Sequence, residues 1–274
     1  MDQLLLIKTL IMGFVEGLTE FLPISSTGHL IITGDLLNFL QKDPREVFEI
    51  FIQLGAILAV CWEYRHKLIH VIAKFPKDPL AQRFVLNLII AFIPAAVIGL
   101  LMGKTIKTYL FSPAPVASAF VAGGLIILWA ERRKHTAHVS EVDDMSWRDA
   151  LKVGLAQCFA LIPGMSRSGS TIIGGLLFGL SRKAATEFSF FLAIPTLTAA
   201  ALYDLYKHRA IVDVGMGGLL ALGFAMSFLS ALLAVRGLLH YISRHDFSAF
   251  AWYRIAFGAL VLITAYTGVV NWSR

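Results

Sequence analysis

Charged residues are scarce in this sequence. Only 15% of its 274 residues are Asp, Glu, Lys or Arg, whereas 57% are hydrophobic, and the mean hydropathy is +0.71. Soluble domains have roughly 45–50% apolar and about 25% charged residues. The shortage of charge therefore excludes an ordinary soluble protein and predicts an integral membrane protein.

Cysteine is rare, and no pattern of a cleavable leader is visible. The two cysteines, Cys61 and Cys158, lie in apolar runs and show neither a disulfide framework nor a metal-binding spacing. The N-terminus does not follow the basic, apolar and small-residue order of a signal peptide, so we expect it to be retained. The net charge of +6 is what basic loops facing anionic lipid would give, and we expect no nucleic-acid partner.

Six apolar runs are candidates for spanning helices, which need about 20 apolar residues. Four long uncharged runs and two shorter ones occupy 84–103, 108–130, 214–235, 255–273, 50–62 and 188–203. Two further regions, about 10–37 and 153–180, are broken by polar residues, glycine and proline. Non-helical backbone at membrane depth must be buried in protein or line a wet cavity. We therefore interpret both regions as re-entrant helical hairpins, with kinked spanning helices as the alternative.

The two halves of the chain resemble each other. At a constant offset of 141, Gly13, Glu16, Pro23, Ser25 and Gly28 align with Gly154, Gln157, Gly164, Ser166 and Gly169. Each half then holds one hairpin and three spans, over 1–135 and 146–274, within a single membrane domain. Because an odd number of spans inverts the second half, we expect an inverted-topology repeat. The expected fold class is an all-α polytopic membrane protein with six spanning helices and two re-entrant hairpins.

The Lys and Arg distribution predicts the orientation. Fifteen of the 24 basic residues, Arg254 among them, are assigned to loops on one side, and eight, including Arg45, to the other; Arg167 lies in the second hairpin. The side richer in Lys and Arg is expected to be cytoplasmic. Both termini and the mouth of the first hairpin would then face outward, and the two hairpin tips would meet inside the bilayer.

Two carboxylates fall in the first hairpin. Glu16 and Glu20 are four residues apart and share one helix face. Charges at membrane depth are candidates for function, and neighbouring carboxylates in a low dielectric repel each other. A divalent cation, Mg²⁺ or Ca²⁺, would neutralise them. The alternative is pairing with lysines of other spans, but no lysine lies inside a long apolar run.

Hydroxyl clusters mark the point where the second helix of each hairpin should begin. They comprise Ser25, Ser26 and Thr27 after Pro23, and Ser166, Ser168 and Ser170 in the second hairpin. Such residues are typical helix N-caps, and a helix start offers N–H groups and a positive dipole to phosphate. One N-cap serine alone is a structural feature, whereas two converging helix starts favour a phosphate site.

The remaining polar groups in these regions are an arginine, a histidine and two glutamines. Arg167 needs an anion, which one of the two glutamates or a phosphate would supply. His29 suits a general acid or base, a nucleophile, a metal ligand or a structural role. Gln53 and Gln157 are expected to bond neighbouring helices, with lining of the site as the alternative.

Together these groups predict the hydrolysis of a phosphoanhydride on a lipid. A metal and an arginine would neutralise charge as the phosphoryl group moves, and a hydroxyl or a water would attack in line. The alternative is a lipid or ion-coupled carrier, because inverted repeats with broken helices also suit transport.

Two motifs carry a resemblance to a known family. EGLTEFLPISSTGH (16–29) and PGMSRSGST (163–171) resemble the signatures of the undecaprenyl-pyrophosphate phosphatases, also called bacitracin-resistance proteins. FEIFIQLGAILAV (48–60) and EFSFFLAIPT (187–196) look like further family segments, so the similarity covers essentially the whole chain. It implies metal-dependent removal of the terminal phosphate from undecaprenyl pyrophosphate. The product, undecaprenyl phosphate, carries peptidoglycan precursors, and its recycling would confer bacitracin resistance.

The resemblance also implies roles for individual residues. Glu16 and Glu20 belong to the acidic, metal-binding motif; Ser26 is the expected nucleophile with His29 assisting, although the reverse assignment stays open. The phosphate-binding set is Ser25, Thr27, Ser166, Arg167, Ser168 and Thr171. The implied location is a bacterial plasma membrane, with a site that opens outward. The expected partners are the lipid substrate, membrane lipids and a second copy of the chain.

One other class of membrane phosphatase is excluded by a missing histidine. Type 2 phosphatidic acid phosphatases also use Ser-Gly-His and Ser-Arg motifs, but they need a histidine about six residues beyond the arginine. No histidine occurs between His138 and His208 in this chain.

Overall fold

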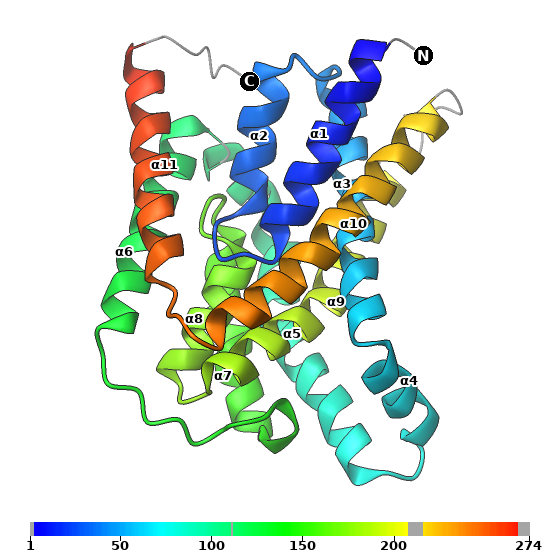
Figure 1. Cartoon of the computed structure of the whole chain (residues 1–274), viewed down its shortest axis with the longest axis vertical. Coiled ribbons are helices and arrows are strands. Elements are labelled where there is room, and N and C mark those ends of the chain that lie inside the picture. Colours follow the sequence, from blue (N-terminus) through cyan, green and yellow to red (C-terminus); the bar gives the residue numbers. More distant parts are fainter. Residues whose placement is uncertain (1–2, 111, 208–215, 268–274) are drawn as a thin grey trace.

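The fold is described by a computed structural model that covers residues 3–110, 112–207 and 216–267 (Figure 1). Its elements are α1 (Gln3–Glu20), α2 (Ser26–Leu36), α3 (Lys42–Glu63), α4 (Arg65–Lys74), α5 (Pro79–Leu110), α6 (Pro113–Glu131), η1 (Val142–Asp144), α7 (Trp147–Gln157), η2 (Cys158–Leu161), α8 (Arg167–Leu177), α9 (Arg182–Lys207), α10 (Gly217–Ile242) and α11 (Ser248–Thr267). Over these described residues the chain forms helices and no strand, which confirms the all-α prediction.

Among the described residues, five helices are long and apolar enough to cross a membrane: α5, α6, α9, α10 and α11. Helices α3 and α4 meet this criterion only as a pair, and they are bent by 76° where they join. Counting the bent pair as one span gives the six that the sequence predicts. The molecule is therefore a multi-pass membrane protein.

Some predicted boundaries are wrong. The run 108–130 includes the end of one helix and the start of the next, because α5 continues to Leu110 and α6 begins at Pro113. Ser112 precedes α6 in an extended conformation, and a proline suits the first helical position because its missing N–H would have no helical partner. The predicted positions 214–215 and 268–273 lie outside the described residues.

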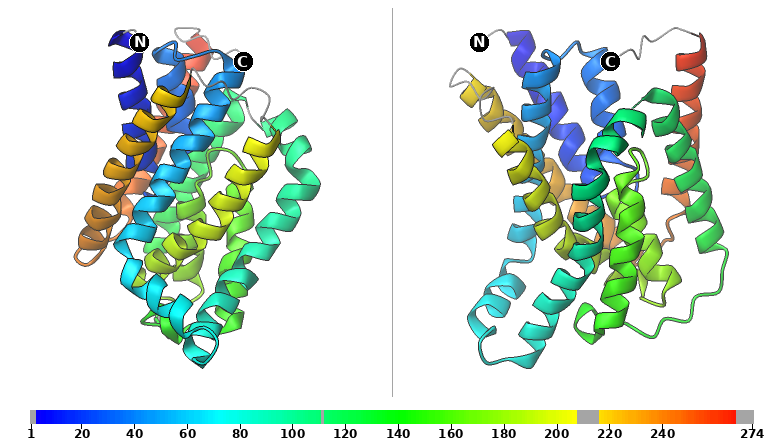
Figure 2. Two further views of the ribbon diagram at one scale, coloured as in Figure 1. Left: turned by 90° about the vertical axis from the view of Figure 1, so that its right-hand side faces the viewer. Right: turned by 180° about the vertical axis from the view of Figure 1, so that it is seen from behind.

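Two broken hairpins occupy the regions where the sequence predicts them. Figures 1 and 2 show α1 and α2 at the end of the molecule where α1 begins, and α7 and α8 nearer the opposite end. Their tips meet in the interior, where the Ser168 hydroxyl donates to the Leu22 carbonyl at 2.7 Å. The re-entrant course in a bilayer and the division into repeats of 1–135 and 146–274 remain predictions.

Each hairpin packs on a span from the other half of the chain. Helix α1 lies against α10, and α7 lies against α5. Glycines permit both crossings: a Cβ on Gly13 would lie 2.5 Å from the Gly223 carbonyl oxygen, and one on Gly154 would lie 2.6 Å from that of Ala91. Each hairpin thus packs on a span that begins far away in the sequence.

Aromatic side chains of α9 form the core beneath the first hairpin tip. The rings of Phe21 and Phe190 meet edge to face with centroids 5.4 Å apart, and those of Phe84 and Phe191 do so at 5.0 Å. Such pairs stabilise beyond their buried area. Because Phe21 follows Glu20 directly, this packing fixes the end of α1.

Two arginines that the sequence analysis assigns to loops are buried. Arg45 is 5% exposed on α3, where it pairs with Asp35 and Glu49, and Arg254 is 0% exposed on α11. The loop assignments fail because both residues flank apolar runs and their helices extend further than those runs. Each side loses one basic residue, so the predicted asymmetry between the sides is unchanged.

Candidate active site

Both hairpin tips are built around a serine with unusual backbone geometry. Ser25 has φ 68° and ψ 99°, and Ser166 has φ 72° and ψ 122°. Positive φ is uncommon for residues other than glycine, and such strained positions gather at functional sites. The two serines are also the aligned pair at offset 141. The same backbone conformation, a serine with positive φ before a helix, therefore occurs in each hairpin.

The serines end the breaks and lead into α2 and α8. Ser166 caps α8 with its side chain, since its hydroxyl oxygen accepts the Gly169 N–H at 3.1 Å. Ser25 precedes α2 without a side-chain capping bond. Of the predicted caps, only Ser25 and Ser166 occupy the N-cap position, whereas Ser26 and Thr27 are helical residues of α2 and Ser168 and Ser170 are helical residues of α8.

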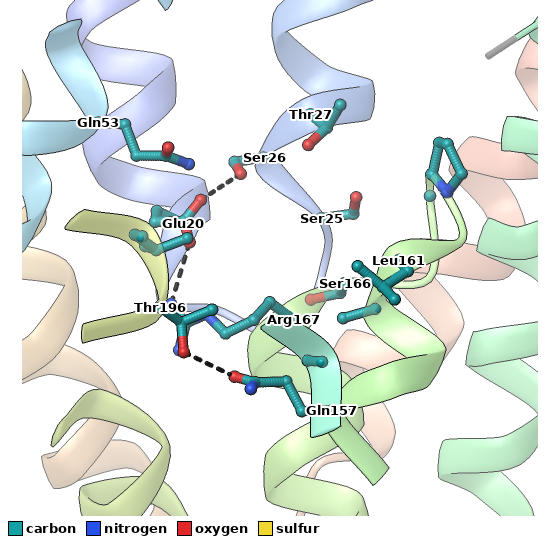
Figure 3. Close-up of a pocket in the computed structure, with 15 residues that line it drawn as sticks. Glu20, Ser25, Ser26, Thr27, Gln53, Gln157, Leu161, Ser166, Arg167 and Thr196 are labelled. Carbon is teal, nitrogen blue, oxygen red and sulfur yellow. Dashed lines mark hydrogen bonds and ion pairs between the residues drawn. The ribbon is translucent and has the colours of Figure 1, made fainter. Parts of the chain in front are cut away.

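Glu20 joins the two tips (Figure 3). The Ser26 hydroxyl donates to Glu20 Oε2, and Arg167 Nη2 donates to Glu20 Oε1 at 3.0 Å. The anion that Arg167 requires is therefore Glu20. Arg167 is held from its other side by Ser189, whose backbone carbonyl accepts from Nη1 at 2.9 Å.

A cavity of about 200 Å³ opens beside this chain of hydrogen bonds. The predicted residues that line it are Glu20, Ser25, Ser26, Thr27, Ser166 and Arg167 (Figure 3). Gln53, Gln157 and Thr196 complete its polar wall. Gln157 also accepts from the Thr196 hydroxyl at 3.2 Å and donates to the Ala91 carbonyl at 3.4 Å, so it both lines the cavity and bonds other helices. The volume admits several water molecules.

Two predicted phosphate-binding residues support the site from outside the cavity wall. The Ser168 hydroxyl lies 3.1 Å from that of Ser166 and donates to the Leu22 carbonyl across the two tips. The Thr171 hydroxyl lies 2.7 Å from that of Ser189, which contacts Arg167. Ser168 therefore contacts a residue that lines the cavity, whereas Thr171 contacts Ser189, which in turn holds Arg167.

His29 points toward α11 rather than into the cavity. Its Nδ1 must donate to the Ser25 carbonyl at 2.7 Å, so in the neutral ring Nε2 accepts from the Tyr253 hydroxyl at 2.6 Å. The ring also stacks on Phe257 with centroids 4.4 Å apart. Both ring nitrogens are thus engaged by groups other than Ser26.

The carboxylate of Glu16 is 1% exposed, and its Oε1 has no hydrogen-bond partner. Within the described ranges no group of three or more His, Cys, Asp or Glu lies close enough to hold a metal. Mg²⁺ usually takes one or two carboxylates together with substrate phosphates. Glu20 lines the cavity and Glu16 does not, so the unpartnered Oε1 of Glu16 is the one observation that fits a cation shared with substrate phosphates.

Two residues of α11 that contact the hairpin tips, Tyr253 and Arg254, are not among the predicted site residues. A signal for Arg254 is present, because it is the one charged residue in 247–273. A lone arginine in an apolar run of a membrane protein is a candidate for function. It was assigned to a loop because the uncharged run begins one residue later.

These features define a multi-pass α-helical membrane protein with a buried polar site between two broken hairpins. Residues 9–260 match the family described as Bacitracin resistance protein BacA, and the chain belongs to this family. The resemblance seen in the two motifs is thus confirmed.

Similar proteins extend over the whole chain. It is 70% identical over 273 residues to Undecaprenyl-diphosphatase 2 of Rhodospirillum rubrum and 68% identical to Undecaprenyl-diphosphatase of Nitrosospira multiformis, with all of each chain covered. It is 64% identical to Undecaprenyl-diphosphatase of Nitrosomonas europaea, over 100% of this chain and 99% of the relative.

Proposed function

We propose that this protein hydrolyses undecaprenyl pyrophosphate to undecaprenyl phosphate and inorganic phosphate. The names of its relatives support the substrate. The observation that carries the proposal is the position of Glu20, which accepts hydrogen bonds from both Ser26 and Arg167 beside the cavity. A hydroxyl, a base and a cation for phosphate thus stand together.

The diphosphate would bind between the two helix starts. Helices α2 and α8 begin at the cavity with the N–H groups and positive dipole ends that favour anions. Arg167 would exchange its hydrogen bond to Glu20 for hydrogen bonds to the terminal phosphate, which a guanidinium binds in bidentate fashion. Glu20 would then be free to act as a base.

The reaction would proceed in two displacements. The Ser26 oxygen attacks the terminal phosphorus while its proton passes to Glu20 Oε2, and the bond to the bridging oxygen breaks. Undecaprenyl phosphate leaves and takes up the proton from Glu20. Water then attacks the phosphoserine, giving a proton to Glu20, and the Ser26 oxygen recovers a proton as inorganic phosphate departs. Arg167 stabilises the charge on the moving phosphoryl group in both steps.

His29 would position the first hairpin tip rather than attack phosphorus. Its Nδ1 holds the Ser25 carbonyl, and its Nε2 is engaged by Tyr253. This geometry favours Ser26 over His29 as the nucleophile.

A divalent cation, Mg²⁺ or Ca²⁺, would be held by Glu16 and Glu20 together with diphosphate oxygens. The unpartnered Oε1 of Glu16 supports this role. When bound, the ion would neutralise phosphate charge.

The finer cellular assignments are also proposals. The Lys and Arg excess at the α4 end supports an inner-membrane orientation with the first hairpin open to the outside. Such a site would recycle the lipid carrier for cell-wall synthesis and confer bacitracin resistance. A homodimer is expected separately, and the mass of the detergent-solubilised protein would test it.

The test is phosphate release from undecaprenyl pyrophosphate by the purified protein in detergent. We expect release that EDTA abolishes and that Mg²⁺ or Ca²⁺ restores, together with a loss of about 10³-fold or more in Ser26→Ala. A trapped phosphoenzyme should carry acid-stable phosphate on Ser26, whereas acid-labile phosphate on His29 would reverse the assignment. No release by folded protein with any metal would reject the enzyme and favour a lipid carrier.

A further inference from the structure

Helix α11 carries a fully buried arginine into the centre of the molecule. Arg254 is 0% exposed. Its guanidinium has five N–H donors, and all five have a backbone carbonyl within hydrogen-bond distance. The acceptors are Pro23 at 3.1 Å and Met165 at 3.0 Å for Nη1, Gly164 at 2.9 Å and Ala119 at 3.2 Å for Nη2, and Phe120 at 3.4 Å for Nε.

Three of these carbonyls belong to the hairpin breaks. Pro23 lies two residues before Ser25, and Gly164 and Met165 immediately precede Ser166. One guanidinium therefore bonds both tips at once and ties them to α6. In the described part of the chain Arg254 makes no ion pair, so backbone carbonyl dipoles and the Phe120 ring, whose centroid lies 5.7 Å from the guanidinium carbon, compensate its buried charge. A buried charge is costly unless it is hydrogen-bonded, and the five carbonyl acceptors make the buried position of Arg254 tenable.

The surrounding helices leave room for the guanidinium. A Cβ on Gly123 of α6 would lie 2.0 Å from Nη2, and one on Gly169 of α8 would lie 3.0 Å from Nη1. Any larger side chain at 123 would displace the guanidinium. The neighbouring Tyr253 supports the same tip through His29.

Few other hydrogen bonds join the two hairpin tips directly. Arg167 bonds Glu20, and Ser168 bonds the Leu22 carbonyl. On the function proposed above, the first tie weakens when substrate phosphate competes for Arg167. The Arg254 bonds go only to backbone carbonyls, so binding of the substrate leaves them intact.

We propose that Arg254 is a positioning residue that sets the distance between Ser26 on one tip and Arg167 on the other during turnover. This inference rests on the proposed function, because the distance matters only if a phosphoryl group moves between these side chains. Small misplacements of reacting groups can cost about 10²-fold in rate.

The test compares steady-state kinetics of two variants with undecaprenyl pyrophosphate. Arg254→Lys keeps the charge but has three donors for five acceptors, and Gly123→Ala displaces the guanidinium without removing it. We expect kcat to fall about 10–100-fold in both, with KM within about threefold of the original protein. The matched control is Gly237→Ala on α10, where an added Cβ would meet nothing within 4 Å, and its kcat should be unchanged.

The outcomes separate this inference from the function on which it rests. If the original protein turns over and both variants keep its kcat, Arg254 has no positioning role. If KM rises while kcat is unchanged, the residue serves substrate binding and the inference is again wrong. A variant whose thermal unfolding midpoint collapses is set aside and the other decides. Folded original protein without turnover would overturn both proposals.

Discussion

The two hairpins share a backbone design but carry different chemistry. Ser25 and Ser166 have nearly equal positive φ values and lead into α2 and α8. At offset 141 in the sequence, however, Glu16 aligns with Gln157, Glu20 with Leu161, and Ser26 with Arg167. The first hairpin supplies the carboxylates and the hydroxyl, and the second supplies the cation. One local fold used twice thus provides two complementary halves of a site.

The largest expected effect comes from removing the guanidinium of the second hairpin, compared with removing a hydroxyl of the same hairpin. Arg167→Ala removes the donor that would stabilise phosphoryl charge, so kcat should fall about 10²–10³-fold. Phosphate release at saturating lipid would measure it. Ser170→Ala, which removes a hydroxyl bonded to the Ser166 carbonyl within α8, is the matched control and should retain most activity. Equal losses in the two variants would mean that helix stability, not charge, is being measured.

A second pair of single variants gives each of the aligned residues Glu16 and Gln157 the side chain of the other. Gln157→Glu buries a new carboxylate at a position that is 1% exposed and should lower the free energy of unfolding by about 2 kcal/mol. Glu16→Gln removes a buried charge whose Oε1 has no hydrogen-bond partner, so it should not destabilise the apoprotein, but it should raise the Mg²⁺ concentration needed for half-maximal activity. Thermal unfolding in EDTA and metal titration would measure the two effects. An unchanged Mg²⁺ response in Glu16→Gln would remove Glu16 from the metal site.

A smaller difference should appear between the two capping serines. Ser166→Ala loses the bond to the Gly169 N–H and should cost about 1 kcal/mol of stability. Ser25→Ala loses no capping bond and should stay within about 0.5 kcal/mol. The unfolding midpoints of both variants would test this, and a larger loss in Ser25→Ala would contradict the difference in capping.

The smallest effect concerns the entry to the second hairpin. Burial acts to raise the pKa of Asp149, but hydrogen bonds from the Ser146 hydroxyl and amide and from His138 outweigh it, so this pKa is lowered from its usual value of 3.8. A carboxyl whose pKa is lowered on folding stabilises the folded protein at pH values above its unfolded-state pKa. This stabilisation is lost as the pH falls through the folded-state pKa. Asp149→Asn should therefore lower the free energy of unfolding at pH 6, and the difference from the original protein should be smaller at pH 3. The exposed Asp144→Asn serves as the control, and a difference for Asp149→Asn that grows toward pH 3 would reverse the sign.

Much of the fold was predictable because apolar length and helix breakers act locally. The breaks near Pro23 and Gly164 and the helix starts at Ser26 and Arg167 follow from residue types that end or cap helices. The α5–α6 boundary was misplaced because the uncharged run 108–130 continues through the junction between the two helices.

The site was predictable in its residue types but not in its contacts. Glu20, Ser26 and Arg167 were expected together, and the structure joins them. That His29 turns toward Tyr253 and that Arg254 bonds both tips depend on α11, which lies more than 200 residues beyond α2 in the sequence. Such contacts arise from the packing of helices and leave no local pattern.

The crossing of each hairpin onto a span of the other half has a consequence for assembly. The most extensive packing partner of each entering helix lies in the other half, since α1 rests mainly on α10 and α7 rests mainly on α5. If the chain were cut in the loop between α6 and α7, the two fragments would behave as mutually dependent subunits. Each would expose a helix with a glycine at its contact, and each would require its complement to be present in the membrane before either became stable.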